Sequence, residues 1–215
     1  MARVAKAKET VEMKAPTEMK IRITLLEDML GTAPNNENIY TEFIASKAPD
    51  AKSVEDEIES VGLEEYTDKQ ITVFHRNKEG KPIIFDYLIK GFFKNACKAM
   101  REVPGSLSSN LAAYKGKIDN LVFVGPRMID INYEGEITIC ERPLRASTAQ
   151  GERVALSMSE SIPAGSTMEL TITTLNETMM KFVIEWLNYG KFNGLGQWHN
   201  SGKGRFTWEC LDDLK

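Results

Sequence analysis

The sequence predicts an α+β fold whose strong elements follow the order βαββαβ. Two observations support this order: apolar residues alternate at the period of a half-buried strand in some segments, and they recur at helical spacing in others. The predicted strands and helices, in chain order, span residues 19–26, 87–101, 153–162, 166–174, 177–189 and 205–211. This order is the ferredoxin-like arrangement that RRM-like modules share, so we expect such a core with insertions.

The first predicted strand begins where the chain acquires a clear period. Met19, Ile21, Ile23 and Leu25 alternate with residues of mixed polarity, as a strand with one buried face requires. Residues 1–18 show neither period, so we expect a flexible tail. We expect a single domain over residues 19–215.

An acidic segment follows the first strand. Residues 55–68 include seven acidic side chains and no Lys or Arg. Ser53 can cap a helix there, with Glu55 near the positive end of the helix dipole. We therefore predict an insertion over about residues 30–68, followed by a hairpin in which NKEG joins ITVFHR to PIIFDY.

Charge is distributed unevenly along the chain. The net charge of −4 and the pI near 5.4 argue against a protein that coats nucleic acid by bulk electrostatics. Residues 76–101 nevertheless contain seven Lys or Arg and two acids, and helix 87–101 distributes its cations over its more polar faces. Local basic surface is therefore expected.

The second half of the chain supplies the remaining elements. We predict a second insertion over about residues 103–150, and then two strands that are separated by the turn-forming segment PAGS. Asn176 is the expected N-cap of helix 177–189, where Met179, Val183 and Trp186 lie on one face.

The composition of this 215-residue chain limits the cellular compartments and the cofactors that we expect for the protein. Cys97, Cys140 and Cys210 lie far apart and form no zinc-binding pattern, so we interpret them as reduced core thiols. No apolar stretch approaches the length of a membrane span, and the N-terminus has no apolar signal segment. We expect a cytoplasmic protein without a metal or cofactor.

Three segments resemble one known family. Four glycines, at positions 194, 196, 202 and 204, lie in a G-x-G-x5-G-x-G frame between the second long helix and the last strand. GKPIIFDYLIKGFFKNA (80–96) contains the pair Lys90-Gly91, and SESIPAGSTMELTI (159–172) contains a Pro-Ala-Gly turn. In this order the segments resemble the RAMP superfamily, the RNA-binding subunits of CRISPR effector complexes, and in particular its effector-backbone subunits.

The resemblance implies an RNA-binding protein of antiviral defence that contacts phosphates and assembles with itself or with related CRISPR-type subunits, away from membranes. Trp198 and His199 would be available to stack on bases. The implied RNA-binding residues are Lys90, Gly91, Lys94, Arg101, Gly194, Gly196, Trp198, His199, Gly202, Lys203, Gly204 and Arg205.

Catalysis is the weaker hypothesis. Some RAMP proteins cut RNA with a histidine or an aspartate, and the candidates in this chain are Asp68, His75 and His199. His75 follows Phe74 in an alternating segment, where a packed histidine is more common than a general base. We therefore favour a protein that is not an enzyme.

Two alternatives remain open. The first is an interaction protein that keeps the RAMP fold without RNA binding, for example a mobile-element inhibitor of a CRISPR complex, whose acidic insertion occupies a basic groove on a partner. A metal-independent endoribonuclease ranks third.

Overall fold

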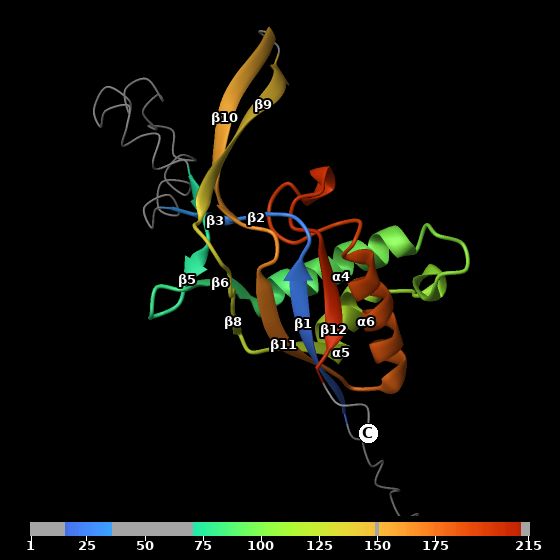
Figure 1. Cartoon of the computed structure of the whole chain (residues 1–215). Helices are drawn as coiled ribbons and strands as arrows, with labels where there is room; N and C mark the ends of the chain where they lie inside the picture. The colour runs from blue at the N-terminus through green and yellow to red at the C-terminus, as the bar shows by residue number, and fades with distance from the viewer. Residues whose placement is uncertain (1–15, 36–70, 149–150, 212–215) are drawn as a thin grey trace, which may run out of the picture.

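The computed structural model describes residues 16–35, 71–148 and 151–211. Its central sheet is antiparallel, with the strand order β12–β1–β11–β7. These strands are β1 (Thr17–Leu25), β7 (Val122–Gly125), β11 (Thr167–Thr174) and β12 (Phe206–Cys210). Helix α4 (Asp86–Met100) lies between β1 and β7 in chain order. Helix α6 (Glu177–Tyr189) lies between β11 and β12 (Figure 1). The predicted ferredoxin-like α+β core with insertions is confirmed.

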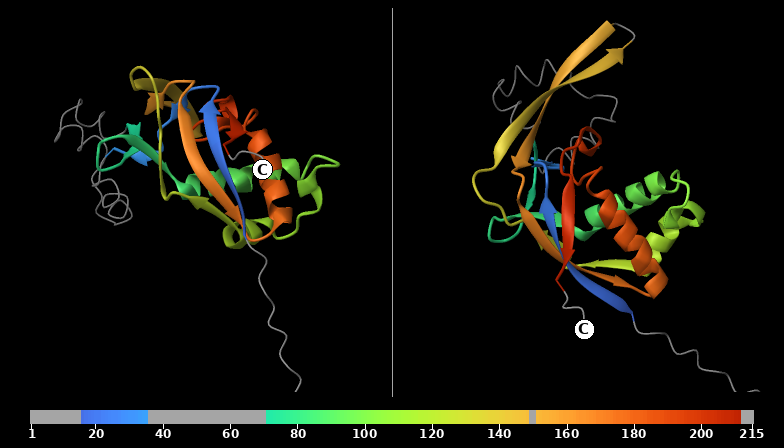
Figure 2. Two further views of the ribbon diagram at one scale, coloured as in Figure 1. Left: turned by 60° about the horizontal axis from the view of Figure 1, so that its bottom comes forward. Right: turned by 45° about the vertical axis from the view of Figure 1, so that its right-hand side comes forward.

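The core lies between one face of this sheet and the two helices, which cover the same side (Figure 2). Ile21 and Ile23 of β1 are fully buried, whereas Lys20 and Arg22, which alternate with them, lie on the other face. On the helices, the Phe93 and Trp186 rings pack with centroids 5.7 Å apart. The alternation read from the sequence therefore identifies the buried face of β1 correctly.

The prediction that residues 153–162 form the second core strand is wrong. That position is taken by the short β7, within the segment 103–150 that was expected to be an insertion. Residues 153–162 belong to β10 (Gly151–Ile162), which pairs antiparallel with β9 (Thr138–Thr148). The two strands form a long hairpin that extends from the body of the protein (Figure 1).

Short strands connect this hairpin to the body. β2 (Met29–Leu30) and β4 (Thr72–Val73) both pair with β10, and β3 (Ala33–Pro34) pairs with β4. A third sheet contains β5 (His75–Arg76), β6 (Pro82–Phe85) and β8 (Met128–Asp130). The predicted NKEG hairpin is confirmed, since β5 pairs antiparallel with β6.

The predicted helices agree closely with the structure. α6 has the expected bounds, and the Asn176 side chain accepts a hydrogen bond from the Met179 amide at 2.8 Å. The helix α5 (Tyr114–Leu121) and the 3-10 turns η1 (Leu107–Asn110) and η2 (His199–Ser201) were not predicted. Among the described residues, no helix is both long and apolar enough to cross a membrane.

Several predictions concern residues outside the described ranges. These include most of the tail over residues 1–18, the Ser53 cap and the acidic segment 55–68. The division into one domain with two insertions therefore stays a prediction. Of the three cysteines, Cys97 is buried in the core, as expected, but Cys140 is half-buried and Cys210 is exposed at the end of β12.

Candidate nucleic-acid interface

The glycine-rich loop, residues 194–205, joins α6 to β12 and folds back on itself. The Leu195 amide donates to the Gly204 carbonyl at 3.0 Å. A Cβ at Gly194 would overlap the Gly204 backbone, and one at Gly204 would overlap the Leu195 carbonyl oxygen. These two glycines therefore allow the two limbs of the loop to pass closely.

The loop also packs against the segment that follows β1. The Gly204 amide donates to the Asp28 carbonyl at 2.7 Å, and the Gln197 amide donates to the Leu30 carbonyl at 3.3 Å. A Cβ at Gly196, where φ is +81°, would lie 2.5 Å from the Leu30 carbonyl oxygen. Thus the close approach at these glycines is to the chain's own backbone.

The two predicted phosphate contacts in the loop are paired with carboxylates. Lys203 Nζ lies 3.0 Å from Asp28 Oδ2, and Arg205 Nη2 lies 2.8 Å from Glu27 Oε1. Burial raises the pKa of Asp28, but the hydrogen bonds from Lys203 and from the Ala164 amide outweigh it and lower that pKa below its ordinary value. Much of the positive charge of the loop is therefore neutralised within the chain.

Replacing Lys203 by methionine should remove pH-dependent stability. Because the pKa of Asp28 is lowered in the folded state, its ion pair stabilises the fold above the ordinary value of 3.8 and is lost as the pH falls through the folded value. We expect urea unfolding to show a less stable variant at about pH 7, and a difference from wild type that disappears as the pH falls through the lowered pKa of Asp28. A difference that persists at low pH would contradict this origin.

The predicted cations of α4 face α5 and β7. Lys94 Nζ lies 2.7 Å from a carboxylate oxygen of Asp119, and Lys90 lies over the Phe123 ring at 5.2 Å. The Arg101 guanidinium lies over the Tyr114 ring at 5.3 Å. Gly91 lies on the same helix, and no atom approaches the position of a Cβ there. These cations contact α5 and β7, whereas the hydrogen bonds of the glycine-rich loop run to residues 26–30, to β9 and to β10.

Trp198 is the exposed aromatic residue of the loop. It has a positive φ of +55°, which is rare for a residue other than glycine, and 44% of its surface is exposed. Arg142 of β9, only 9% exposed, places its guanidinium carbon 4.9 Å from the Trp198 ring centroid. Arg142 Nη2 also donates to Gln197 Oε1 at 2.8 Å. Arg142 therefore connects the base of the hairpin to the loop, a role that was not predicted.

The structure describes two of the three catalytic candidates, His75 and His199, and these two contact different elements. Asp68 lies outside the described residues. His75 on β5 makes an edge contact with the Phe85 ring at 4.8 Å, as a packed histidine does. His199 Nδ1 lies 3.1 Å from the Gly196 carbonyl, which can only accept, so in the neutral ring Nδ1 carries the proton and Nε2 is the acceptor. The part of the chain that the structure describes contains no cluster of three potential metal ligands.

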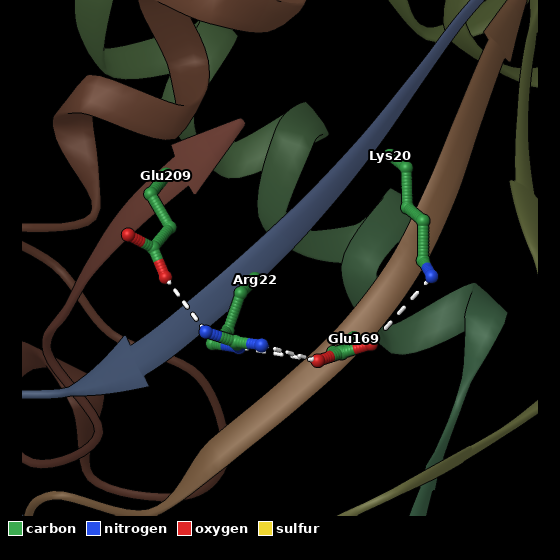
Figure 3. A network of polar contacts seen from close by, with 4 residues as sticks. All are labelled: Lys20, Arg22, Glu169 and Glu209. Atoms are coloured by element: carbon green, nitrogen blue, oxygen red, sulfur yellow. Dashed lines mark hydrogen bonds and ion pairs between the residues drawn. The ribbon is translucent and has the colours of Figure 1, made fainter. Parts of the chain in front are cut away.

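The uncovered face of the central sheet carries a charge network (Figure 3). Arg22 pairs with Glu169 at 2.8 Å and with Glu209 at 3.0 Å, and Lys20 lies 3.7 Å from Glu169. Hydrogen bonds within this network raise the pKa of Arg22 and lower that of Glu169. The two central strands, β1 and β11, contain no aromatic residue. The central strands therefore lack the stacking rings with which RRM sheets bind bases, and the aromatic ring on this face is Phe123 of the edge strand β7, opposite Thr173 and 44% exposed.

The sequence matches no family model and no curated protein. One similar solved chain comes from "Cryo-EM structure of the Type III-B Cmr-beta bound to cognate target RNA". The likeness covers 92% of this chain and 59% of that chain, with 11% identity and a TM-score of 0.48. A likeness at this level establishes neither a family nor a function.

Proposed function

We propose that the chain is an RNA-binding protein of the RAMP type, a cytoplasmic, backbone-like subunit of a CRISPR-type ribonucleoprotein in antiviral defence. The three resembling segments support this proposal, and so does the confirmed ferredoxin-like core. The observation on which it chiefly depends is the half-exposed Trp198 ring, placed on the glycine-rich loop beside the base of the β9–β10 hairpin.

Trp198 has the properties of a base-stacking platform. Holding a non-glycine residue at a positive φ costs on the order of 1 kcal/mol, so the fold favours this ring position despite the strain. The Arg142 guanidinium lies against the ring, while a large part of the ring surface stays accessible. Because every base has a π-face, stacking on such a ring does not depend on sequence.

Arg142 supplies a second argument for a nucleic-acid ligand. Its side chain is buried, and among the described residues its guanidinium pairs with no carboxylate and its Nη1 has no hydrogen-bond partner. Buried cations are normally compensated by an anion. We propose that a phosphate next to a base stacked on Trp198 provides that compensation.

The hairpin supports the proposed assembly with a second copy or with related subunits. Ile139 and Leu156 are 47% and 54% exposed, and the register places Pro143 opposite Leu156 on the same face. A two-stranded ribbon is marginally stable by itself, so contact with a neighbouring subunit would stabilise this one.

The proposed function predicts that Trp198→Ala weakens binding of single-stranded RNA about 5- to 150-fold, because stacking of one base contributes roughly 1–3 kcal/mol. Titration of a fluorescently labelled RNA oligonucleotide measures this effect. Tyr87→Ala is the matched control, since Tyr87 is 49% exposed on α4 and lies outside the loop. Equal affinity of the Trp198 variant and wild type would contradict the proposed site.

A second candidate function is an interaction protein that acts through the acidic residues 55–68. The pairing of Lys94, Lys203 and Arg205 with carboxylates favours it, because these three belong to the five cations that were predicted to contact phosphates. Wild-type protein that binds no RNA in the same titration would support this alternative.

A further inference from the structure

A polar cleft of about 410 Å³ lies between the C-terminal half of α4, the segment after α6, and η2. Each of these three segments contributes one asparagine to its lining: Asn95, Asn193 and Asn200. His199 also lines the cleft. It follows Trp198 in the chain, so the glycine-rich loop contributes adjacent residues to the cleft and to the stacking platform.

The polar groups of the cleft are available to a ligand. Among the described residues, the side chains of Asn95 and Asn200 make no hydrogen bond, and both residues are exposed. The Asn193 Oδ1 atom is enclosed and has no partner in the described part of the chain, so this oxygen reaches a ligand once the carboxamide turns toward the cleft. His199 Nδ1 is occupied by the Gly196 carbonyl, which leaves Nε2 as an acceptor.

The charge of the cleft favours a neutral polar ligand over a free anion. Lys98 is its one lysine, and Glu102, just after the end of α4, offsets that charge. Carboxamides present a donor beside an acceptor, which is the pattern that pairs with the edges of nucleobases. Tyr189 adds an aromatic ring to the lining.

We propose that this cleft binds a single nucleobase, whose polar edge pairs with the three carboxamides and with His199 Nε2. The inference deepens the proposed function, since the base would belong to the bound RNA. A base-sized ligand suits the volume, because ligand clefts of a few hundred Å³ enclose small molecules of this kind.

The two histidines of the chain allow a direct test by proton NMR. Titration with each of the four nucleoside 5′-monophosphates should shift the ring signal of His199 for at least one of them and leave His75 unchanged. Ribose 5-phosphate, which lacks the base, should shift neither signal. The inference is overturned if no nucleotide shifts His199, or if ribose 5-phosphate shifts it equally.

Variants separate the cleft from the rest of the surface. Asn95→Ala combined with Asn200→Ala should weaken nucleotide binding about tenfold or more, since each lost hydrogen bond contributes about 1 kcal/mol. Asn120→Ala, an exposed asparagine on α5, is the matched control and should bind as wild type does. Equal binding by the double variant and the control overturns the inference.

The nucleotide titration can contradict the cleft without contradicting the proposed function, and the reverse is also true. Wild-type protein that binds an RNA oligonucleotide but shows no His199 shift would overturn only the cleft. Protein that binds mononucleotides but no RNA would leave the cleft a nucleotide site and contradict the proposed function.

Discussion

Gly204→Ala should lower the free energy of unfolding by about 3 kcal/mol or more. Gly204 has a φ of +68°, a region that costs an alanine roughly 1–2 kcal/mol. The added Cβ would also overlap the Leu195 carbonyl oxygen, a backbone atom that cannot move without displacing the loop. Displacement would in turn strain the hydrogen bond from the Gly204 amide to the Asp28 carbonyl. Urea unfolding of the variant and wild type measures the loss.

Gly202→Ala is the matched control for that substitution. Gly202 also has a positive φ, of +95°, but the nearest atom to its would-be Cβ is Arg205 Nε at 3.5 Å, an ordinary contact distance. The Gly202→Ala variant should therefore lose only the backbone contribution, roughly 1–2 kcal/mol. Equal losses in the two variants would show that overlap with the Leu195 oxygen is not important.

Two glycines of the loop have a structural role. From the sequence, their backbone freedom suggests close approach to a phosphate or to a neighbouring chain. The structure gives Gly194 and Gly204 an internal role, since the two limbs of the loop cross there. The loop is therefore a frame that positions the Trp198 ring and the His199 imidazole, and any ligand contact depends more on these side chains than on glycine amides.

The periodicity of apolar residues predicted most of the core, but it did not predict which strand is the second strand of the central sheet. The alternation of β1 and the apolar faces of both helices are local properties, so they were readable from the sequence. β7 is a four-residue strand at the sheet edge, and so short a run shows no period. β10 alternates well, yet its partner is β9. Alternation indicates that a strand buries one face, but it does not indicate which other strand pairs with it.

The candidate site was predicted in part. Trp198 and His199 both belong to the glycine-rich motif that the sequence analysis identified. His199 lines the cleft, and the Trp198 ring lies against Arg142. Arg142 was missed because it lies far from the loop in sequence, within a segment assigned to an insertion. The pairing of Arg205 with Glu27 could have been found, because antiparallel pairing of the first and last strands places Phe206 opposite Leu25.

The second large effect is expected at Phe206, the first residue of β12, which anchors the end of the loop. Its side chain is fully buried and packs against the Phe92 ring with centroids 5.0 Å apart. The Phe206 amide also donates to the Gly190 carbonyl at 2.9 Å, so the two ends of the loop connection meet there. Phe206→Ala should lower the free energy of unfolding by about 3–5 kcal/mol, the usual loss for truncating a buried phenylalanine.

Gly190 allows a double-mutant test of this anchor. Its backbone has an ordinary helical φ of −55°, so an alanine there would be unstrained apart from its Cβ, which would lie 2.5 Å from two atoms of the Phe206 ring. Gly190→Ala should therefore destabilise the wild type by about 1–3 kcal/mol. In the Phe206→Ala protein the ring is absent, and the same substitution should cost almost nothing. Urea unfolding of the four proteins gives the coupling energy. Strictly additive losses would show that the Phe206 ring does not fix the path of the chain at Gly190.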